Sequence, residues 1–132
     1  MTAPAPPSAR RARGREAEEL AARFLAERGI EVVARNHAVR GGEVDLVCRD
    51  GDVICFVEVR SRSSTAQGGP EETIDRRKAR RVVIAAGDWA VRNGGLDRRF
   101  RFDVVAVTFV EAAPRIVHFP GAFDEDGRPG HW

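Results

Sequence analysis

Residues 42–60 limit the possible fold more than any other stretch of this 132-residue chain. They read Gly-Glu-Val-Asp-Leu-Val-Cys-Arg-Asp-Gly-Asp-Val-Ile-Cys-Phe-Val-Glu-Val-Arg, which is two runs of largely alternating side chains separated by turn residues. Asp50-Gly51 favours a two-residue type I′ turn, because both residues tolerate the positive φ angles that this turn requires. The stretch is therefore predicted to form a β-hairpin.

The predicted turn also sets the register of the hairpin, because Arg49 then pairs with Asp52 and each earlier residue pairs with a later one. Side chains alternate along a strand, so one face of the hairpin is predicted to be apolar. This face comprises Val44, Leu46, Cys48, Val53, Cys55 and Val57. The other face comprises Glu43, Asp45, Val47, Ile54, Phe56, Glu58 and Arg60. In this register Glu43 lies directly opposite Glu58, Asp45 lies diagonal to Glu58, and the two cysteines are diagonal to each other.

The acidic face of the hairpin is chemically unusual, since like charges that oppose each other across a strand pair repel. If this face is partly buried, Glu43, Asp45 and Glu58 require protonation or a cation. Two interpretations stay open: a site for Mg²⁺ or Mn²⁺, which prefer carboxylate oxygens, and the exposed polar face of an edge hairpin. Ile54 and Phe56 on the same face favour the metal site, because large apolar side chains are usually covered.

The rest of the chain predicts helices and further strands around the hairpin. Residues 13–28 predict a helix that stops at Gly29, and residues 71–93 predict a second helix that begins after Pro70. Strands are predicted at 30–35, 101–110 and 115–119, and loops at 36–42 and 61–70. The order α-β-β-β-α-β-β predicts an α/β fold with a mixed central sheet of about five strands flanked by helices. Residues 1–11 are predicted to be a disordered tail, 12–123 one domain, and 124–132 a loose C-terminal tail.

Composition bears on the cellular setting. Hydrophobic residues make up 42% of the chain, enough for one core, and a formal net charge of +2 by itself indicates no class of partner. Cys48 and Cys55 are predicted to be buried free thiols in a reducing cytosol. No apolar run reaches the roughly 20 residues of a membrane span, and no secretory signal is visible. We therefore expect a cytoplasmic protein with no membrane partner.

Positive charge is concentrated in two short segments. The first is Arg76-Arg77-Lys78-Ala79-Arg80-Arg81 on the second predicted helix, and the second contains Arg98, Arg99 and Arg101. One interpretation is a solvated helical face. Few acidic residues interleave with these cations, however, so binding of nucleic-acid phosphate is at least as consistent with the pattern.

An acidic residue, a hairpin turn and then Glu-x-basic at the end of the next strand form the active-site pattern of the PD-(D/E)XK nucleases. Asp45 and Glu58-Val59-Arg60 match this pattern. More narrowly, the chain resembles the YraN-like family of small bacterial proteins and, through it, the archaeal Holliday-junction resolvases. The matching residues span nearly the whole chain after residue 13: Ala17-Glu18, residues 20–25, Gly29, Asn36, residues 42–47, residues 56–60, Gly69-Pro70, Glu72, Lys78, residues 101–105 and Ala122-Phe123.

The resemblance implies a restriction-endonuclease-like fold and a role for each site residue. Asp45 and Glu58 would hold Mg²⁺ or Mn²⁺, with the Val59 carbonyl as a third ligand. Glu18 would reach the site from the first helix, although its helical periodicity alone indicates a surface glutamate. The remaining roles are supporting: Glu43 beside the cluster, and Lys78 as a phosphate contact on the second helix. Asp103, near the start of the strand at 101–110, is predicted to be either a charge at a turn or a supporting residue of the site.

Two positions depart from the family pattern. Arg60 stands where the family usually has lysine, and arginine stays protonated, so it can bind phosphate but cannot act as a general base. Ala17 replaces a usual glycine, which only stiffens the start of the helix.

The implied function is a metal-dependent endonuclease that acts on DNA, including branched or structured DNA. Two alternatives remain: a nuclease-fold protein that binds nucleic acid without cutting it, and a scaffold whose hairpin docks a protein partner. Four-way junctions are two-fold symmetric, so a resolvase role would also require a homodimer.

Overall fold

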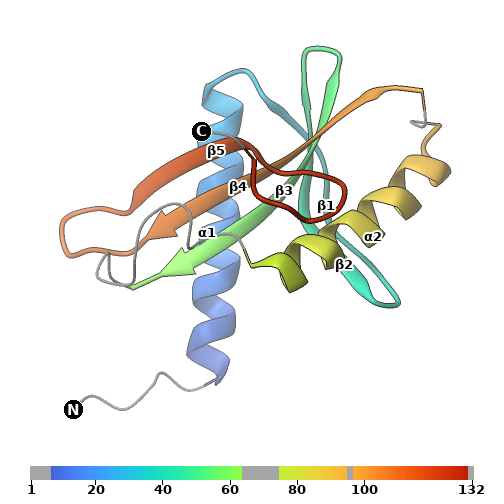
Figure 1. Ribbon diagram of the computed structural model, residues 1–132. Helices are drawn as coiled ribbons and strands as arrows, with labels where there is room; N and C mark the ends of the chain where they lie inside the picture. The colour runs from blue at the N-terminus through green and yellow to red at the C-terminus, as the bar shows by residue number, and fades with distance from the viewer. Residues whose placement is uncertain (1–6, 64–74, 95–96, 131–132) are drawn as a thin grey trace.

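The computed structural model describes residues 7–63, 75–94 and 97–130 of the chain. Within these residues the elements follow the predicted order α-β-β-β-α-β-β (Figure 1). They are α1 (Pro7–Glu27), β1 (Glu31–Val39), β2 (Gly42–Asp50), β3 (Val53–Arg62), α2 (Arg76–Arg92), β4 (Arg99–Thr108) and β5 (Arg115–Phe123). The predicted α/β architecture is confirmed.

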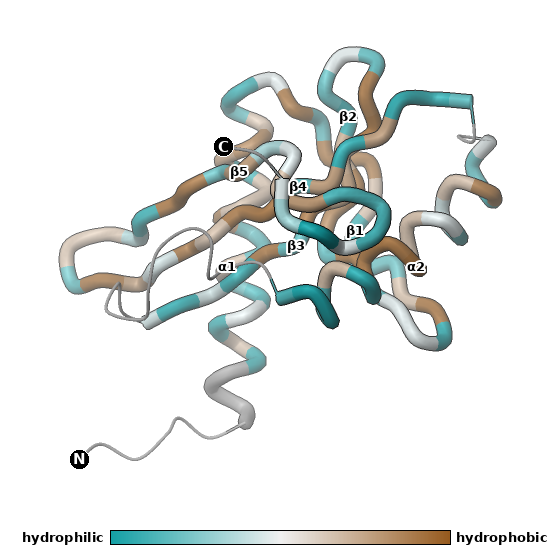
Figure 2. The backbone as a smooth tube through the Cα atoms, in the orientation of Figure 1, coloured by the Kyte–Doolittle hydropathy of each residue, from teal (hydrophilic) through white to brown (hydrophobic). Residues whose placement is uncertain are grey.

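The strands form one mixed sheet in which sequence order and spatial order coincide, β1-β2-β3-β4-β5. Neighbouring strands are antiparallel except for β3 and β4, which are parallel. A parallel pair requires a crossover connection, and α2 lies in that connection. Strands β3 and β4 each contain a continuous buried run, residues 54–58 and 103–108, and these runs are largely apolar (Figure 2).

Two apolar clusters, one on each side of the sheet, hold the helices in place. On the α1 side, Ala21 and Leu25 pack on Leu46, Val57 and other buried strand residues. On the α2 side the members come from both strands and helix: Val44, Val47, Ile54, Phe56, Ala79, Val82, Ala85, Ala86, Val104, Ala122 and Phe123. The helices therefore cover opposite faces of the sheet (Figure 1). No helix in the described part of the chain combines the length and apolar character needed to cross a membrane.

Both helices begin at places that differ from the sequence prediction. Helix α1 starts at Pro7 instead of about residue 13, so residues 7–11, expected to be disordered, are helical. Proline is tolerated at the first helical position, because an N–H group there would have no hydrogen-bond acceptor within the helix. Helix α2 starts at Arg76, after the N-cap Asp75, whose Oδ1 accepts a hydrogen bond of 2.9 Å from the Arg77 amide. The predicted helical residues 71–74 lie outside the described part, as do residues 64–70 of the predicted loop.

Residues 42–60 form the predicted hairpin, but its turn is displaced by one residue. Asp50 pairs with Val53, so Gly51 and Asp52 are the turn residues, in place of the predicted Asp50 and Gly51. Of these two described residues only Gly51 has a positive φ, 63°. This matches a two-residue turn of type II′, which has glycine at its first central position. It does not match type I′, in which both central residues have positive φ.

The displaced turn shifts the hairpin pairing by two residues. Cys48 and Cys55 face each other directly instead of diagonally, and both are buried and free. Burial raises the pKa of each thiol to about 12, so both are unreactive at neutral pH. The predicted opposition of Glu43 and Glu58 was wrong for the same reason.

Two further segments are more ordered than predicted. Strand β1 continues through the predicted loop to Val39, with a left-handed φ of 52° at Asn36. After β5, residues 124–130 fold back toward α2 instead of forming a loose tail. The Asp124 amide donates to the Arg128 carbonyl at 2.9 Å, and buried Gly127 lies against Arg80.

Candidate active site

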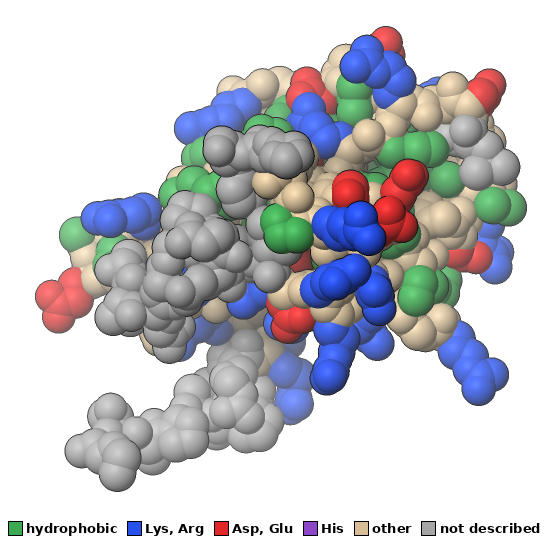
Figure 3. Space-filling model, viewed as in Figure 1, with side chains coloured by type: hydrophobic (Ala, Val, Ile, Leu, Met, Phe, Trp, Pro, Cys, Tyr) green, Lys and Arg blue, Asp and Glu red, His purple; other side chains and the backbone are tan. Residues whose placement is uncertain are grey.

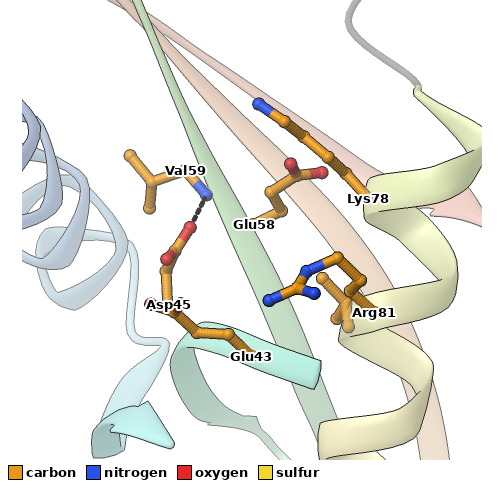
Figure 4. Close-up of a pocket in the computed structure, with 7 residues that line it drawn as sticks. Glu43, Asp45, Glu58, Val59, Lys78 and Arg81 are labelled. Atoms are coloured by element: carbon orange, nitrogen blue, oxygen red, sulfur yellow. Dashed lines mark hydrogen bonds between the residues drawn. The ribbon is translucent and has the colours of Figure 1, made fainter. Parts of the chain in front are cut away.

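One cavity of about 250 Å³ opens between β2, β3 and the N-terminal half of α2 (Figure 4). Six of its seven lining residues are candidate site residues from the sequence: Glu43, Asp45, Glu58, Val59, Lys78 and Arg81. The seventh is Val82. The acidic residues come from the sheet and the basic residues come from the helix. The cavity thus places carboxylates opposite cations around one open space.

Asp45 lies where the pairing between β2 and β3 ends. The last paired residues are Leu46 and Val57, and beyond them the Val59 amide donates to Asp45 Oδ2 at 2.7 Å (Figure 4). Burial raises the pKa of Asp45 to about 7; the Val59 hydrogen bond opposes the shift, and the charges of Glu18, Glu58 and Glu43 add to it. Among the described residues, the neighbouring charges that shift this pKa are all negative, so an ionised Asp45 adds to a cluster of negative charge.

Glu58 is the most buried carboxylate of the cavity, with 7% of its surface exposed, whereas Asp45 is half-buried. Burial raises its pKa, whereas the positive charges of Arg60 and Lys78 favour the ionised form. Its side chain lies beside Lys78 in Figure 4. Lys78 of α2 and Arg60 of β3 therefore partly offset the negative charge of this carboxylate.

Glu18 reaches the same cluster from α1 without lining the cavity. Burial raises its pKa, a hydrogen bond from the Asn36 side chain opposes the shift, and the charge of Glu43 adds to it. The charge of Glu18 in turn raises the pKa of Asp45. The interpretation as a purely solvent-facing glutamate, which periodicity favoured, was therefore wrong; the left-handed Asn36 that meets it could not be foreseen from the helix pattern.

Arg81 lines the cavity because α2 crosses the start of β2 at very short range. A Cβ atom on Gly42 would lie 2.5 Å from the Arg81 carbonyl oxygen and 2.9 Å from the Ala85 amide nitrogen. Only glycine permits this approach of two backbones. Arg81 was expected to bind nucleic acid generally, and its place in the cavity was missed; the glycine at position 42 was the available signal.

Asp103 was predicted as a supporting residue, but the structure does not bring it to the cavity. It is 1% exposed and accepts hydrogen bonds from Arg101 (2.9 Å) and the Gly121 amide (3.0 Å). The Nε2 atom of His118 lies 2.9 Å from Asp103 Oδ2. Burial opposes ionisation, yet the bonds from His118 and Arg101 outweigh it and lower the pKa of Asp103. This network joins β4 to β5.

Residues 17–107 match the sequence model of the family described as "Uncharacterised protein family UPF0102". The chain belongs to this family. The matched span includes every residue that lines the cavity, together with Glu18 and Arg60.

Three relatives illustrate how close the similarity is. A UPF0102 protein of Anaeromyxobacter sp. (strain Fw109-5) is 69% identical over 123 residues, which cover 93% of this chain and 92% of the relative. The UPF0102 protein of Anaeromyxobacter dehalogenans is 67% identical with the same coverage. That of Geobacter metallireducens is 40% identical over 111 residues, covering 84% and 91% of the two chains.

The other predicted nucleic-acid-binding cations of this UPF0102 protein fall on two separate surfaces. Lys and Arg side chains gather over the N-terminal half of α2, with acidic side chains directly beside them (Figure 3). Those acids come from the C-terminal loop: Glu125 and Asp126 line a pocket together with Arg76, Arg80 and Arg128. The local sequence of α2 has few acidic residues between these cations, and a distant segment of the chain supplies acidic side chains beside them. Arg98 and Arg99 lie elsewhere, in a pocket with Asp52 and Asp97.

A divalent cation can be tested against the donor atoms of the UPF0102 cavity. Among the described residues no group of three or more His, Cys, Asp or Glu side chains is arranged to hold a metal ion. Asp45 and Glu58 nevertheless offer two hard carboxylate oxygen donors in one cavity, and either protonation or a bound cation would relieve the negative charge around Asp45. Mg²⁺ is usually bound through one or two carboxylates and completes its shell with water and substrate phosphate. The residues fit such an ion and do not form a closed protein cage.

Proposed function

We propose that this UPF0102 protein is a metal-dependent endonuclease that hydrolyses phosphodiester bonds in DNA, including branched or structured DNA. The observation that carries the proposal is the composition of one cavity, where Asp45 and Glu58 face Lys78 and Arg81. Carboxylates suit a divalent cation, and the basic side chains suit the phosphate that the cation would accompany. The resemblance of Asp45 and Glu58-Val59-Arg60 to the PD-(D/E)XK pattern supports the same reaction.

The residues of the cavity divide into two groups by role. Asp45, Glu58 and the Val59 carbonyl would hold Mg²⁺ or Mn²⁺, and Glu18 and Glu43 would strengthen the local negative potential. The bound ion would activate water and stabilise negative charge on the phosphate oxygens. Lys78 and Arg81 would bind and orient the phosphate from the helix side of the cavity. Arg60, beside Glu58, would serve as a further phosphate contact, because a guanidinium does not release its proton.

A second candidate function is nucleic-acid binding without cleavage. The observation that favours it is Arg60, which stands where the nuclease pattern has a lysine. In that case the cavity would bind a phosphate through Lys78 and Arg81 and leave it intact. The two candidates differ in turnover and not in binding, so one assay separates them.

The deciding experiment measures cleavage of linear, flapped and four-way DNA with Mg²⁺ or Mn²⁺, alongside binding of the same DNAs without metal. We expect the wild-type protein to cut and the near-isosteric variants Asp45→Asn and Glu58→Gln to bind but not cut. Glu111→Gln, an exposed change on the β4–β5 connection, is the matched control and should retain activity. Binding without cutting by the wild type would establish the second candidate. If both cavity variants cut DNA as fast as the wild type, the cavity is not the active site.

A further inference from the structure

A second pocket, separate from the cavity, lies at the other end of α2 and has a volume of about 290 Å³. It is lined by Val33, Arg49, Ile54, Trp89, Asn93 and Arg98. These residues come from β1, β2, β3, the end of α2 and the segment before β4. The pocket thus combines an aromatic ring, an amide and two guanidinium groups, and the proposed reaction uses none of them.

Trp89 is held in a defined orientation by the core beneath it. Its ring packs edge-on against Phe56, with ring centroids 5.9 Å apart and an interplanar angle of 76°. Phe56 is buried, whereas Trp89 is half-buried and contributes to the pocket lining. A fixed, partly accessible indole is a ready surface for stacking a planar ligand, because little side-chain entropy is lost on binding.

The polar groups around Trp89 have unused hydrogen-bonding capacity. The Asn93 amide nitrogen donates to the Trp89 carbonyl at 2.8 Å, which leaves the Asn93 side-chain oxygen available as an acceptor. Arg49 donates one bond, of 2.6 Å, to Glu31 and retains other guanidinium donors. Arg98 is exposed and forms no ion pair among residues 7–63, 75–94 and 97–130, although Asp52 and Asp97 line a neighbouring pocket with it.

We propose that this pocket binds an unpaired nucleobase of the substrate, which stacks on Trp89 while Arg98 and Arg49 contact the flanking phosphates. The proposal rests on the proposed function in taking the substrate to be nucleic acid. A base within a duplex is stacked on its neighbours and cannot enter such a pocket, so the strand that reaches it must be single-stranded. The preferred substrate is then DNA with an unpaired stretch, such as a flap or an overhang.

The position of the pocket on α2 sets its distance from the cavity. Trp89 follows Arg81 by eight residues and Lys78 by eleven residues on the same helix. At about 1.5 Å per residue these separations correspond to roughly 12 and 16 Å along the axis. A stacked strand advances about 3.4 Å per nucleotide, so the unpaired base lies roughly four or five nucleotides from the phosphate in the cavity.

The first test uses the fluorescence of Trp89 in a Trp132→Phe variant, in which Trp89 is the remaining tryptophan. A 12-nucleotide oligothymidylate and a blunt duplex of equal length are titrated separately with EDTA present. We expect the single strand to quench the indole emission in a saturable manner, because stacking brings a base onto the ring. Absence of quenching, or equal quenching by the blunt duplex, would overturn the proposal.

The second test measures affinity for the same labelled single strand by fluorescence anisotropy. We expect Trp89→Leu to weaken binding roughly 5- to 150-fold, the range for loss of one base–aromatic stack. Arg98→Ala should weaken it and reduce the dependence of log affinity on log salt by about one. The control Arg115→Ala, an exposed arginine at the start of β5, should leave affinity unchanged.

The two tests keep the pocket distinguishable from the proposed cleavage. Trp89 packs on Phe56, so circular dichroism must show that Trp89→Leu is folded. If it unfolds, the quenching result and the exposed variant Arg98→Ala decide the question. Because EDTA prevents metal-dependent cutting, quenching with no cleavage in the earlier assay would support the pocket and refute the nuclease. Cleavage without quenching would support the nuclease and refute the pocket.

Discussion

Asp45 is the residue whose ionisation most directly links the site to stability. Burial raises its pKa from the ordinary value of 3.8 to about 7. Between these values the folded protein binds more protons than the unfolded chain, so the free energy of unfolding decreases as pH rises. The carboxylate that would hold a cation therefore destabilises the metal-free fold above pH 7.

Replacing Asp45 by asparagine should remove this penalty while an oxygen remains to accept the Val59 amide. At pH 8 without divalent metal we expect Asp45→Asn to be more stable than the wild type by about 2 kcal/mol. The pKa shift of Asp45 alone would correspond to roughly 4 kcal/mol, and solvent screening reduces this value. At pH 4 the difference should nearly vanish. Urea unfolding at both values measures the effect, with Glu111→Gln as the control. A gain of equal size at both values would contradict the assigned cause.

At the scale of elements, the placement of α2 against β2 depends on one glycine. Gly42 allows the helix backbone to approach so closely that Arg81 reaches the cavity. The atoms that a side chain at this position would meet belong to the helix backbone, which cannot rotate away as a side chain can.

We expect Gly42→Ala to destabilise the fold by about 1–3 kcal/mol, the usual cost of overpacking a close contact, and to reduce cleavage by displacing Arg81. Gly87→Ala is a matched control in the same helix, because a Cβ there meets nothing within 4 Å. Alanine favours helix over glycine, so this control should gain about 0.5–1 kcal/mol. Chemical denaturation compares the two variants. Similar unfolding free energies would mean that α2 can move away from β2 at little cost.

The elements also show why sequence reasoning succeeded in some places and failed in others. Alternation identified the core face around Leu46 and Val57 although the turn was misplaced, because a shift of two residues preserves the alternation. Val44 was assigned to that same face but packs on the α2 side. Its neighbour Asp45 leaves the β2–β3 ladder, and alternation alone does not predict where a ladder ends.

At the scale of the whole molecule, the arrangements that the sequence missed depend on contacts between distant segments. The pairing of Asp103 with His118 joins two strands, and no local pattern announces it. The acids beside the arginines of α2 come from Glu125 and Asp126, more than 40 residues after Arg80. Asp45 and Glu58, in contrast, were predictable because one short hairpin carries both.

The acidic C-terminal loop should weaken nucleic-acid binding by α2. We expect the double variant Glu125→Gln/Asp126→Asn to bind duplex DNA several-fold more tightly at low salt, because it removes two negative charges beside Arg76 and Arg80. The gain should fade near 0.5 M salt, where exposed charges are screened. Anisotropy titrations at several salt concentrations test this, with Glu111→Gln as the control. Unchanged affinity at low salt would show that DNA does not contact this surface.

The parallel pairing of β3 with β4 has a consequence for the order of folding. Each residue of β3 pairs with one that follows 46 positions later, as Val53 does with Arg99, whereas β1, β2 and β3 are joined by short connections. Chain entropy makes distant pairings form more slowly than local ones. The β1–β2–β3 meander is therefore expected to form first and to bring Asp45 and Glu58 together before β4 completes the sheet. In a nascent chain the carboxylates would then be in place before the helix cations that face them.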